Sequence, residues 1–546
     1  MFLLTRSRYS YRFSCHTRCL HTGIRATNRP FQKSITRRIA IISATAVSIY
    51  AIDELYYASL LQRSARAVYV LLWVAYQYSR NIDKYDSIND LHEIASEKLF
   101  AMIEKNKGLY IKQGQAVANQ ASVFPVAYQK RFSGLYDAAP QDLWSDVDRV
   151  LRKNLGSDYE TQIFEYIEHD PVASASIAQV HRAKLKDEQT LVAVKVQHPY
   201  ISKQVAVDLA VYRGISWVYS RLFDLPLSFF TRYISDQIIK EADFRIEAAH
   251  SERIAKLLRE DKALDNLCFH IPATYNMYTR KQVLVSEWID GVSLADKNKL
   301  VDAKFNLTTL MSQYLNLFGR QIFEYGFVHS DPHPGNLLAR FHKGKQQLVL
   351  LDHGLYVSLS PKFQSEYCEL WKYLFCFDQK SIERIAEEWG VGSTDLLSTI
   401  VQLRPPKNAD LSKSRNSLDL IRSLLGDEAK FPLELLFILR TMRMMQNLNQ
   451  SMGSPVNRVN LLTNSAIQLS HRTKLDLTHR ATWLQILQIR FGLLFSDVVF
   501  WILRLRQLIL GRFYGTTGKG LEDYIDAYMK ETARSFGLEF AEEVPV

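Results

Sequence analysis

The order of secondary-structure patterns predicts an α+β fold with two lobes, a small strand-rich lobe followed by a larger helical one. Two β-prone runs, 175–185 and 190–199, are separated by a polar turn and are typical of a hairpin. A third β-prone run, 282–291, follows a long helical pattern, and helical spacing dominates from about Ser293 onward. Strands first and mostly helices afterwards predict an α+β lobe joined to a helical lobe.

The composition fits a large folded chain. Its 546 residues are 47% apolar, which is enough to build an extensive core. Five cysteines are scattered without the spacing of a disulfide framework or a zinc site. The formal net charge of +11 raises nucleic acid or an anionic membrane as partners, so the position of the excess charge matters.

Most of that excess lies at the N-terminus. Residues 1–38 carry nine basic side chains, and the first acidic residue of the chain is Asp53. An Arg-rich, Ser/Thr-rich and acid-free leader predicts a mitochondrial presequence, and a disordered basic arm that binds polyanions is the alternative. Without the leader there is no basic patch with interleaved aromatic residues, so we expect no nucleic-acid binding.

An uncharged apolar run, 39–52, follows the leader and predicts a membrane anchor over 39–61. A helix of this run covers roughly 20 Å against a hydrocarbon core of about 30 Å, so spanning would need its flanks to reach the interfaces. An interfacial or buried helix is therefore the alternative. The basic flank before the run predicts that the N-terminus stays in the matrix and that the remainder faces the intermembrane space.

Helical spacing also precedes and follows the two lobes. A helical extension is predicted over 85–170. Near the C-terminus the apolar stretch 484–510 contains several charged side chains, which favour a packed or peripheral membrane helix over a second span.

The segment 328–338, VHSDPHPGNLL, carries the clearest chemical signal. Asp331 is followed five residues later by Asn336, which is the spacing of a kinase catalytic loop with His329 in its leading position. Asp331 would face the substrate hydroxyl as the catalytic residue, and Asn336 would hold Mg²⁺. Sixteen residues beyond Asn336, Asp352 follows an apolar run in LLDHG and fits the metal-binding Asp of a DFG-type motif, with His353 in place of the phenylalanine.

Three upstream positions complete a kinase-like order. Lys195 ends a β-prone run and would neutralise the phosphates of a bound nucleotide. Glu247 lies in a helical segment and can pair with it as the αC-type glutamate. The strand end 285–288, with Glu287, predicts a hinge whose backbone could bind adenine. The expected ligands are therefore ATP or ADP and Mg²⁺.

A set of five motifs in this order resembles the UbiB (aarF-domain) family of atypical kinase-like proteins, and the resemblance covers about residues 85–360. The motifs are KQGQ at 112–115, ASASIAQVH at 173–181, EADFRIEA at 241–248, HSDPHPGN at 329–336, and DHG at 352–354.

The resemblance implies a protein-kinase-like fold with a helical N-terminal (KxGQ) extension folded over the active site and a helical C-terminal extension. It implies that Lys112 and Gln115 approach the nucleotide pocket, with Lys112 near Glu241 and Asp243. It also implies an alanine-rich loop in place of the glycine-rich loop. The nucleotide-binding residues of that loop are Ala173, Ser174, Ala175 and Ser176.

Alanine Cβ atoms restrict the close approach of backbone amides to phosphates, so altered phosphate geometry is expected. A helical lid over the pocket would also crowd a protein substrate. The resemblance therefore favours ATPase activity or phosphorylation of a small molecule or lipid, connected with coenzyme Q or lipid homeostasis at a mitochondrial membrane. A pseudokinase whose nucleotide state gates lipid binding is the alternative.

The predicted domain boundaries follow from these patterns and from the resemblance. They are a presequence (1–38), an anchor (39–61), the KxGQ extension (85–170), an N-lobe (171–291), a C-lobe (292–400) and a helical C-terminal extension (401–546).

Overall fold

The computed structural model divides into two units, residues 1–59 and 60–546. The predicted presequence lies outside the described residues as far as residue 29, and part of the predicted C-terminal extension, 401–429, lies outside them too. The described residues are 30–57, 59–81, 84–85, 87–118, 125–135, 141–224, 227–264, 268–376, 378–391, 430–472, 483–514 and 518–535.

The first unit contains the helix α1 (Pro30–Tyr57), which begins at a proline, a residue suited to the first helical position. It includes the apolar run 39–52 but continues through Asp53 and Glu54. Across the described ranges, no helix combines the length and the apolarity that crossing a membrane requires. The expected spanning anchor at 39–61 is therefore corrected, since its apolar run is short and bordered by charges on both sides.

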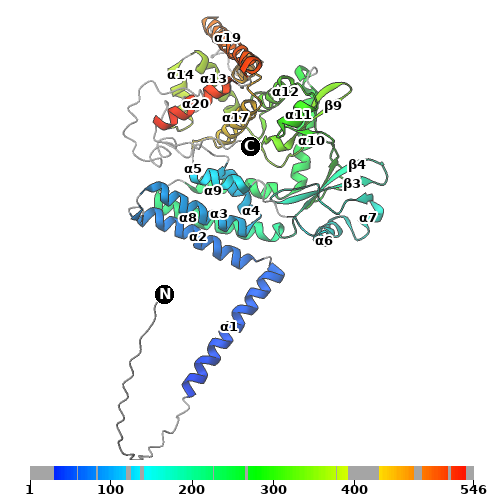
Figure 1. The fold of residues 1–546 in the computed structure, drawn as a ribbon, viewed down its shortest axis with the longest axis vertical. Coiled ribbons are helices and arrows are strands. Elements are labelled where there is room, and N and C mark those ends of the chain that lie inside the picture. The colour runs from blue at the N-terminus through cyan, green and yellow to red at the C-terminus, as the bar shows by residue number, and fades with distance from the viewer. Residues whose placement is uncertain are drawn as a thin grey trace, which may run out of the picture. The chain divides into compact units, whose positions relative to one another are not determined.

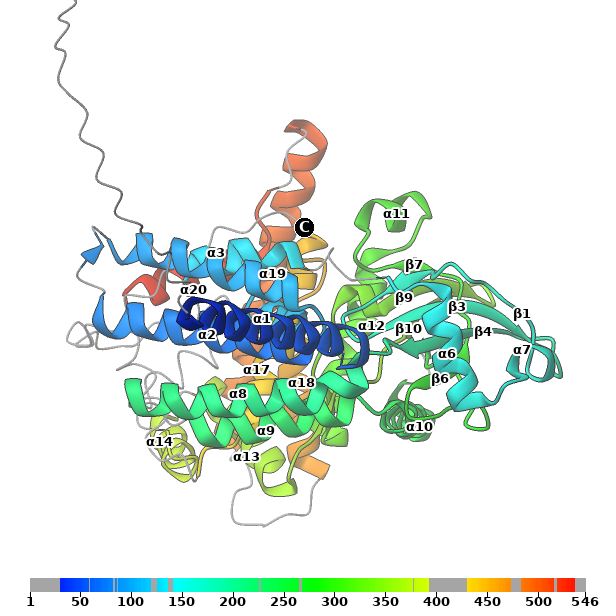
Figure 2. The same ribbon diagram turned by 90° about the horizontal axis from the view of Figure 1, so that it is seen from below.

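The second unit begins with a helical layer formed by two distant parts of the sequence. In Figures 1 and 2 the extension helices lie beside a helical hairpin that follows β4, and contacts join α2 to both α3 and α8. A buried ion pair between Arg63 and Asp208, 2.6 Å apart, fixes α2 to α8. The elements of this layer are α2 (Leu60–Arg80), α3 (Ile88–Asn106), α4 (Leu109–Ala118), α5 (Val126–Phe132), η2 (Ser133–Leu135), α8 (Ile201–Phe223) and α9 (Leu227–Glu241).

The hairpin α8–α9 was expected to belong to the N-lobe, because it lies between two β-prone runs of that lobe. The structure packs it against the KxGQ extension as well as against the N-lobe, where Ile201 of α8 and Ile238 of α9 share a hydrophobic cluster with Ala178 of β3. The helical layer is therefore built from residues on both sides of the first strands. The ion pair that joins them spans 145 residues of sequence. Local spacing cannot predict such a pairing.

The N-lobe is an antiparallel sheet in the order β1-β3-β4-β6, with β2 paired to β3. Burial alternates along β4, so Val194 and Val196 join the core beneath α6 and Lys195 faces the other side. In the register, Lys195 lies between Val180 of β3 and Leu284 of β6. The elements are α6 (Trp144–Leu155), α7 (Tyr159–Gln162), β1 (Phe164–Ile167), β2 (Ala173–Ser174), β3 (Ala178–Leu185), β4 (Leu191–Gln197), α10 (Phe244–Glu260), η3 (Lys262–Leu264) and β6 (Val283–Glu287).

The C-lobe is mainly helical and holds two small sheets, β5-β10-β9-β7 and β11-β8. Leu337 pairs with Leu350, which places the loop before β9 beside the loop after β10. The elements up to residue 358 are β5 (Phe269–His270), β7 (Val292–Ser293), α11 (Lys297–Asp302), α12 (Leu307–Arg320), η4 (Gln321–Tyr325), β8 (Phe327–His329), η5 (Pro334–Asn336), β9 (Leu337–His342), β10 (Lys345–Leu350) and β11 (Tyr356–Ser358).

The helices after β11 complete the C-lobe. Ile438 and Met445 of α17 and Leu462 of α18 belong to the same hydrophobic core as Phe318 of α12 and Leu370 of α13. The described part of the C-terminal extension is therefore integral to the lobe. These helices are α13 (Pro361–Cys376), α14 (Gln379–Glu388), α17 (Glu434–Ser451), α18 (Arg458–Arg472), α19 (Trp483–Tyr514) and α20 (Leu521–Ser535).

Candidate active site

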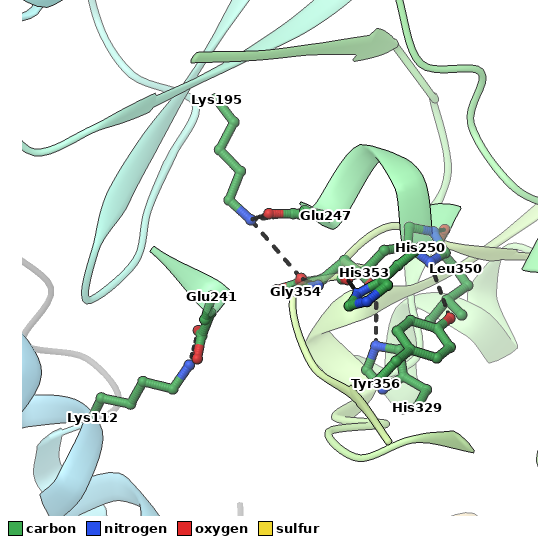
Figure 3. A network of polar contacts seen from close by, with 11 residues as sticks. Lys112, Lys195, Glu241, Glu247, His250, His329, Leu350, His353, Gly354 and Tyr356 are labelled. Carbon is green, nitrogen blue, oxygen red and sulfur yellow. Dashed lines mark hydrogen bonds and ion pairs between the residues drawn. The ribbon is translucent and has the colours of Figure 1, made fainter. Parts of the chain in front are cut away.

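Lys195 of β4 lies at the centre of the candidate site, between Glu247 of α10 and Asp352. Its Nζ is 2.8 and 3.0 Å from the two carboxylate oxygens of Glu247 and 3.9 Å from Oδ1 of Asp352 (Figure 3). Burial disfavours the ammonium, but the carboxylates of Asp352 and Glu247 outweigh it and raise the pKa of Lys195 above its usual value. Lys195 therefore stays protonated, as a ligand for phosphate oxygens must be.

Glu247 is positioned by the start of α10. Asp243 caps this helix by accepting a hydrogen bond from the backbone N–H of Arg245, and Phe244 is fully buried against the N-lobe. Glu247 lies one turn later, only 3% exposed. A carboxylate so deeply buried is stable only beside a cation, so this geometry holds Lys195 and α10 together.

Asp352 follows β10 and keeps an accessible carboxylate. Its side chain is 39% exposed, and Oδ1 accepts a hydrogen bond from the N–H of Gly354 at 2.8 Å. Burial opposes ionisation, but Lys195 and the Gly354 N–H lower the pKa of Asp352 well below its ordinary value. Asp352 is therefore ionised at neutral pH, as an oxygen ligand of a metal ion would have to be.

Asn336 lies beside Asp352 through the backbone. It ends η5 immediately before β9, and its carbonyl accepts a hydrogen bond from the N–H of Leu351 at 2.9 Å. A carboxylate and an amide oxygen on adjacent loops suit Mg²⁺, which commonly binds one or two protein oxygens together with phosphates. Among the residues that the structure describes, no group of three or more His, Cys, Asp or Glu side chains is placed to hold a metal ion. A metal ion at Asp352 and Asn336 would therefore also need phosphate oxygens as ligands.

His329 ties the catalytic loop to the metal-binding loop. The N–H of Asp331 donates to its Nδ1 at 3.0 Å, so the proton resides on Nε2, which donates to the carbonyl of Asp352 at 2.8 Å. Burial lowers the pKa of His329, which keeps the ring neutral and this tautomer in place. His333 has a local role, since its Nδ1 accepts from the N–H of Gly335 at 3.1 Å.

His353, which replaces the phenylalanine of a DFG-type motif, is a buried polar link. Its Nε2 donates to the carbonyl of Leu350 at 3.2 Å, so its Nδ1 accepts from the hydroxyl of Tyr356 at 3.0 Å. Nδ1 of His250 on α10 donates to the carbonyl of His353 at 3.1 Å. Burial lowers the pKa of His353 to about 3, and the neutral ring links the end of β10 to β11 (Figure 3). The carbonyl of the same residue links the DHG loop to α10.

Asp331, the predicted catalytic residue, is engaged by the C-terminal extension. Nη2 of Arg440 on α17 lies 3.0 Å from Oδ1 of Asp331, and both side chains are partly exposed. The neighbouring Thr441 donates its hydroxyl to the carbonyl of His329 at 3.2 Å. Helix α17 therefore contacts the 329–336 loop at two places, the carboxylate of Asp331 and the carbonyl of His329.

The KQGQ motif reaches the site on α4. Lys112 forms an ion pair with Glu241 at the end of α9 (Figure 3). Burial lowers the pKa of Lys112 to about 8, although the carboxylates of Asp331 and Asp352 favour its charged form. Asp243 is not brought to Lys112, because Arg245 occupies its carboxylate at 2.6 Å. Gln115 lies on α4 as well, but its side chain is outside the described part of the structure.

The two ion pairs meet at Gly354. A Cβ added to this glycine would lie 3.2 Å from Asp352, 3.4 Å from Glu241 and 4.0 Å from Glu247. The Lys112–Glu241 pair and the Lys195–Glu247 pair therefore border the same backbone position, two residues after the predicted metal ligand Asp352.

The alanine-rich loop is the turn between β2 and β3. Ala173 and Ser174 pair with β3, and the N–H of Ala175 donates to the carbonyl of Ala178 at 2.8 Å. Nε2 of His198 donates to the carbonyl of Ala175 at 2.9 Å. The loop is thus held in a fixed hairpin, with Ser176 nearly buried at its end.

A second contact secures the same loop. Nδ1 of His198 lies 2.7 Å from the carboxylate of Asp142, whose backbone N–H donates to Oε1 of Gln179 at 2.8 Å. Both Gln179 and His181 of the AQVH sequence are essentially buried. These two motif residues therefore build the loop and its support.

Glu287 ends β6 at the predicted hinge, but its side chain turns away. Its Oε2 accepts from Nε2 of His270 at 2.7 Å and from the N–H of Ala273 at 3.2 Å. Any contact of this strand end with a nucleotide would therefore be made by the main chain.

Three contributors to the site were missed from the sequence, namely Arg440, Asp142 and Tyr356. Arg440 is separated from Asp331 by 109 residues and lies in a helix without a recognisable motif. Asp142 likewise pairs with His198 across 56 residues. Tyr356 could have been suspected from its place directly after the DHG motif.

Known proteins resemble this chain over most of its length. Residues 134–386 match the family described as the ABC1 atypical kinase-like domain. The ABC1 family protein lscO of Purpureocillium lilacinum is 33% identical over an alignment of 559 residues, gaps included, which covers 92% of each chain. The ABC1 family protein C10F6.14c of Schizosaccharomyces pombe is 35% identical over 462 residues, 81% of this chain and 85% of its own. AarF domain-containing protein kinase 1 of Mus musculus is 27% identical over 476 residues, covering 82% and 88%.

Proposed function

Because the chain belongs to the ABC1 (UbiB/aarF) family of atypical kinase-like proteins, we propose that it binds and turns over ATP with Mg²⁺ in mitochondria. It acts as an ATPase or as a kinase of a small molecule or lipid, in support of coenzyme Q distribution or lipid homeostasis. The observation that carries the proposal is the position of Lys195, which contacts both Glu247 and Asp352.

Each residue has a role that its surroundings support. Lys195 would neutralise phosphate oxygens while Glu247 fixes its direction, and Asp331 would accept the proton of the attacking hydroxyl or water. Asp352 and Asn336 would hold Mg²⁺, which supplies charge neutralisation on the phosphates when it is bound.

The lid favours a small acceptor over a protein. The Lys112–Glu241 pair borders Gly354, next to Asp352, and so takes up space beside the proposed phosphate and metal site. A loop held by alanine rather than glycine also restricts how closely the backbone approaches phosphates. A membrane lipid or an isoprenoid quinone is the partner class proposed, and no nucleic acid.

The test is ATP hydrolysis by the full chain with Mg²⁺ and lipid vesicles. Asp352→Asn should abolish turnover because it removes the anionic metal ligand. Asp302→Asn, at an exposed position at the end of α11, is the matched control and should retain full activity. Equal rates of ATP hydrolysis by wild type and Asp352→Asn would contradict the proposal.

A silent pseudokinase is the second candidate, and the Arg440–Asp331 pair favours it. A guanidinium 3.0 Å from Oδ1 of Asp331 competes with an incoming hydroxyl for that carboxylate. In that case the nucleotide state would gate lipid binding. Nucleotide binding that is lost when Lys195 is replaced, together with no ATP hydrolysis in the presence of any lipid vesicle, would support the pseudokinase.

The proposed location is the mitochondrial inner membrane, with the lobes facing the intermembrane space. It is supported by the basic, acid-free leader, whose composition is typical of a mitochondrial presequence. Protease treatment of mitochondria with opened outer membranes should degrade the lobes. Protection until the inner membrane is disrupted would place them in the matrix instead.

A further inference from the structure

Helix α19 carries an uncovered apolar face that the catalytic proposal does not use. Eleven large apolar side chains of its described part are each at least 45% exposed, and the helix lies at the periphery of the C-terminal helices (Figures 1 and 2). Soluble proteins rarely expose a continuous apolar surface of this extent without a partner. The six most exposed of these side chains are Phe491, Leu494, Phe495, Trp501, Ile502 and Phe513.

The exposed residues form one stripe along the helix. From Leu487 to Leu508 they recur at alternating steps of four and three, and Phe495 and Ile502 widen the stripe. From Leu487 to Leu508 the stripe extends roughly 32 Å at 1.5 Å per residue. The opposite side, with Ile489 and Phe500, is buried against the protein. The helix therefore has one face fixed to the C-lobe and one face turned outward.

The charges beside the stripe have a single sign. Arg490, Arg506 and Arg512 are exposed at its edges or its end. The one acidic residue in the sequence of α19, Asp497, accepts a hydrogen bond from Nδ2 of Asn457 at 2.9 Å. An apolar face with a rim of arginines is complementary to the surface of an anionic membrane, where the acyl region receives the apolar side chains and the headgroups receive the guanidinium groups.

A second copy of the chain fits this face less well. Paired coiled-coil helices need a narrow seam flanked by opposite charges, whereas here the flanking positions of Phe495 and Ile502 are apolar. An antiparallel copy would bring Arg490 close to Arg512 of its partner helix without an acidic residue of α19 to compensate. The single sign of the rim therefore selects a negatively charged surface.

We propose that α19 lies flat on an anionic lipid bilayer, with its exposed apolar face in the interfacial region, and that it docks the C-lobe on the membrane. This inference deepens the membrane location proposed above and rests on it. It needs no nucleotide chemistry, because the helix is a binding surface. A protein without ATP turnover could still dock through α19, and an active one could fail to, so the two proposals fail separately.

The first experiment measures co-sedimentation of the full chain with phosphatidylcholine vesicles that do or do not contain phosphatidylglycerol. Trp501→Glu should weaken binding to the anionic vesicles at least tenfold. Trp217→Glu on α8 is the matched control, because Trp217 and Trp501 are both 65% exposed, and it should bind like wild type. Arg490→Gln should lower binding roughly fivefold on anionic vesicles and leave binding to neutral ones unchanged.

A second measurement reports on α19 alone, which matters if the N-terminal segment also binds vesicles. An environment-sensitive fluorescent amino acid at the exposed position Val498 should shift its emission to the blue with anionic vesicles. Unchanged emission at 498, or equal loss of binding in Trp501→Glu and Trp217→Glu, would overturn the proposal. A blue shift that depends on protein concentration without vesicles would overturn it in favour of a second copy. Unchanged thermal unfolding of each variant shows that the fold is retained.

Discussion

Removing Lys195 should destabilise the protein more than an ordinary surface ion pair does. In Lys195→Met the carboxylate of Glu247 stays buried and loses a partner at 2.8 Å. Breaking a buried pair from one side costs about 3–5 kcal/mol. Since the side chain of Lys195 is still 19% exposed, some water can replace it. We therefore expect a loss of about 2–4 kcal/mol in the free energy of unfolding.

The assay is urea unfolding of a double-mutant cycle. Glu247→Gln in the Lys195→Met background removes the uncompensated charge and should recover part of the loss, with a coupling energy of about 1–3 kcal/mol. The control is Lys184→Met in the same sheet. Lys184 pairs with Glu165 at the same 2.8 Å, but their side chains are 25% and 45% exposed. That pair should contribute only about 0.2–1 kcal/mol.

The comparison of the two lysines decides the outcome. If Lys195→Met costs no more than Lys184→Met, the pair is not buried in solution. A cycle without coupling would mean that Lys195 and Glu247 do not interact. Either result would refute the argument that this half of the site is assembled by the fold.

Three further perturbations test the surroundings of the site. Arg440→Gln should raise ATP turnover up to about fivefold, because a partly exposed pair with Asp331 is worth up to about 1 kcal/mol; slower turnover would show that Arg440 assists the reaction. In stopped-flow measurements, Lys112→Met and Glu241→Gln should each speed the release of a fluorescent ATP analogue by the same factor, and the double variant should release it no faster than either single variant. Additive effects would show that the two residues act separately. Burial lowers the pKa of His353 to about 3 in the folded protein, whereas the pKa in the unfolded chain is about 6.5. Between these two pH values the unfolded chain binds one more proton than the folded protein. The free energy of unfolding therefore falls as the pH falls through this window. His353→Phe should flatten that decline by about 1.4 kcal/mol per pH unit in urea unfolding at successive pH values, and an unchanged slope would contradict this.

The strands that carry the site could be predicted because their burial follows local rules. The run 190–199 is β-prone, with valine at 192, 194 and 196, and β4 buries these three side chains on one face, as the period of a strand requires. The preceding polar turn also behaves as expected, since Gln189 adopts φ 54° in it. The family and the order of the kinase-like motifs follow from the same local information.

Contacts between distant segments could not be predicted in this way. Arg440 reaches Asp331 only because α17 is part of the C-lobe core, and nothing in the sequence around either residue indicates the other. Membrane crossing was wrongly expected at 39–61, because the helix that contains the apolar run is not apolar enough over a membrane-spanning length. Tertiary packing and total helix apolarity decided these two features.

The two halves of the site differ in what controls them. The proposed phosphate-binding half is assembled by the fold, since Lys195 and Glu247 are paired and Asp352 lies within 3.9 Å of the same ammonium. In the proposed acceptor half, Arg440 pairs with the carboxylate of Asp331. Control of turnover is therefore expected to lie in the C-terminal extension rather than in α10. Because Arg443, three residues after Arg440, pairs with Asp526 of α20 at 2.9 Å, a displacement of α20 would act on the helix that carries the restraining guanidinium.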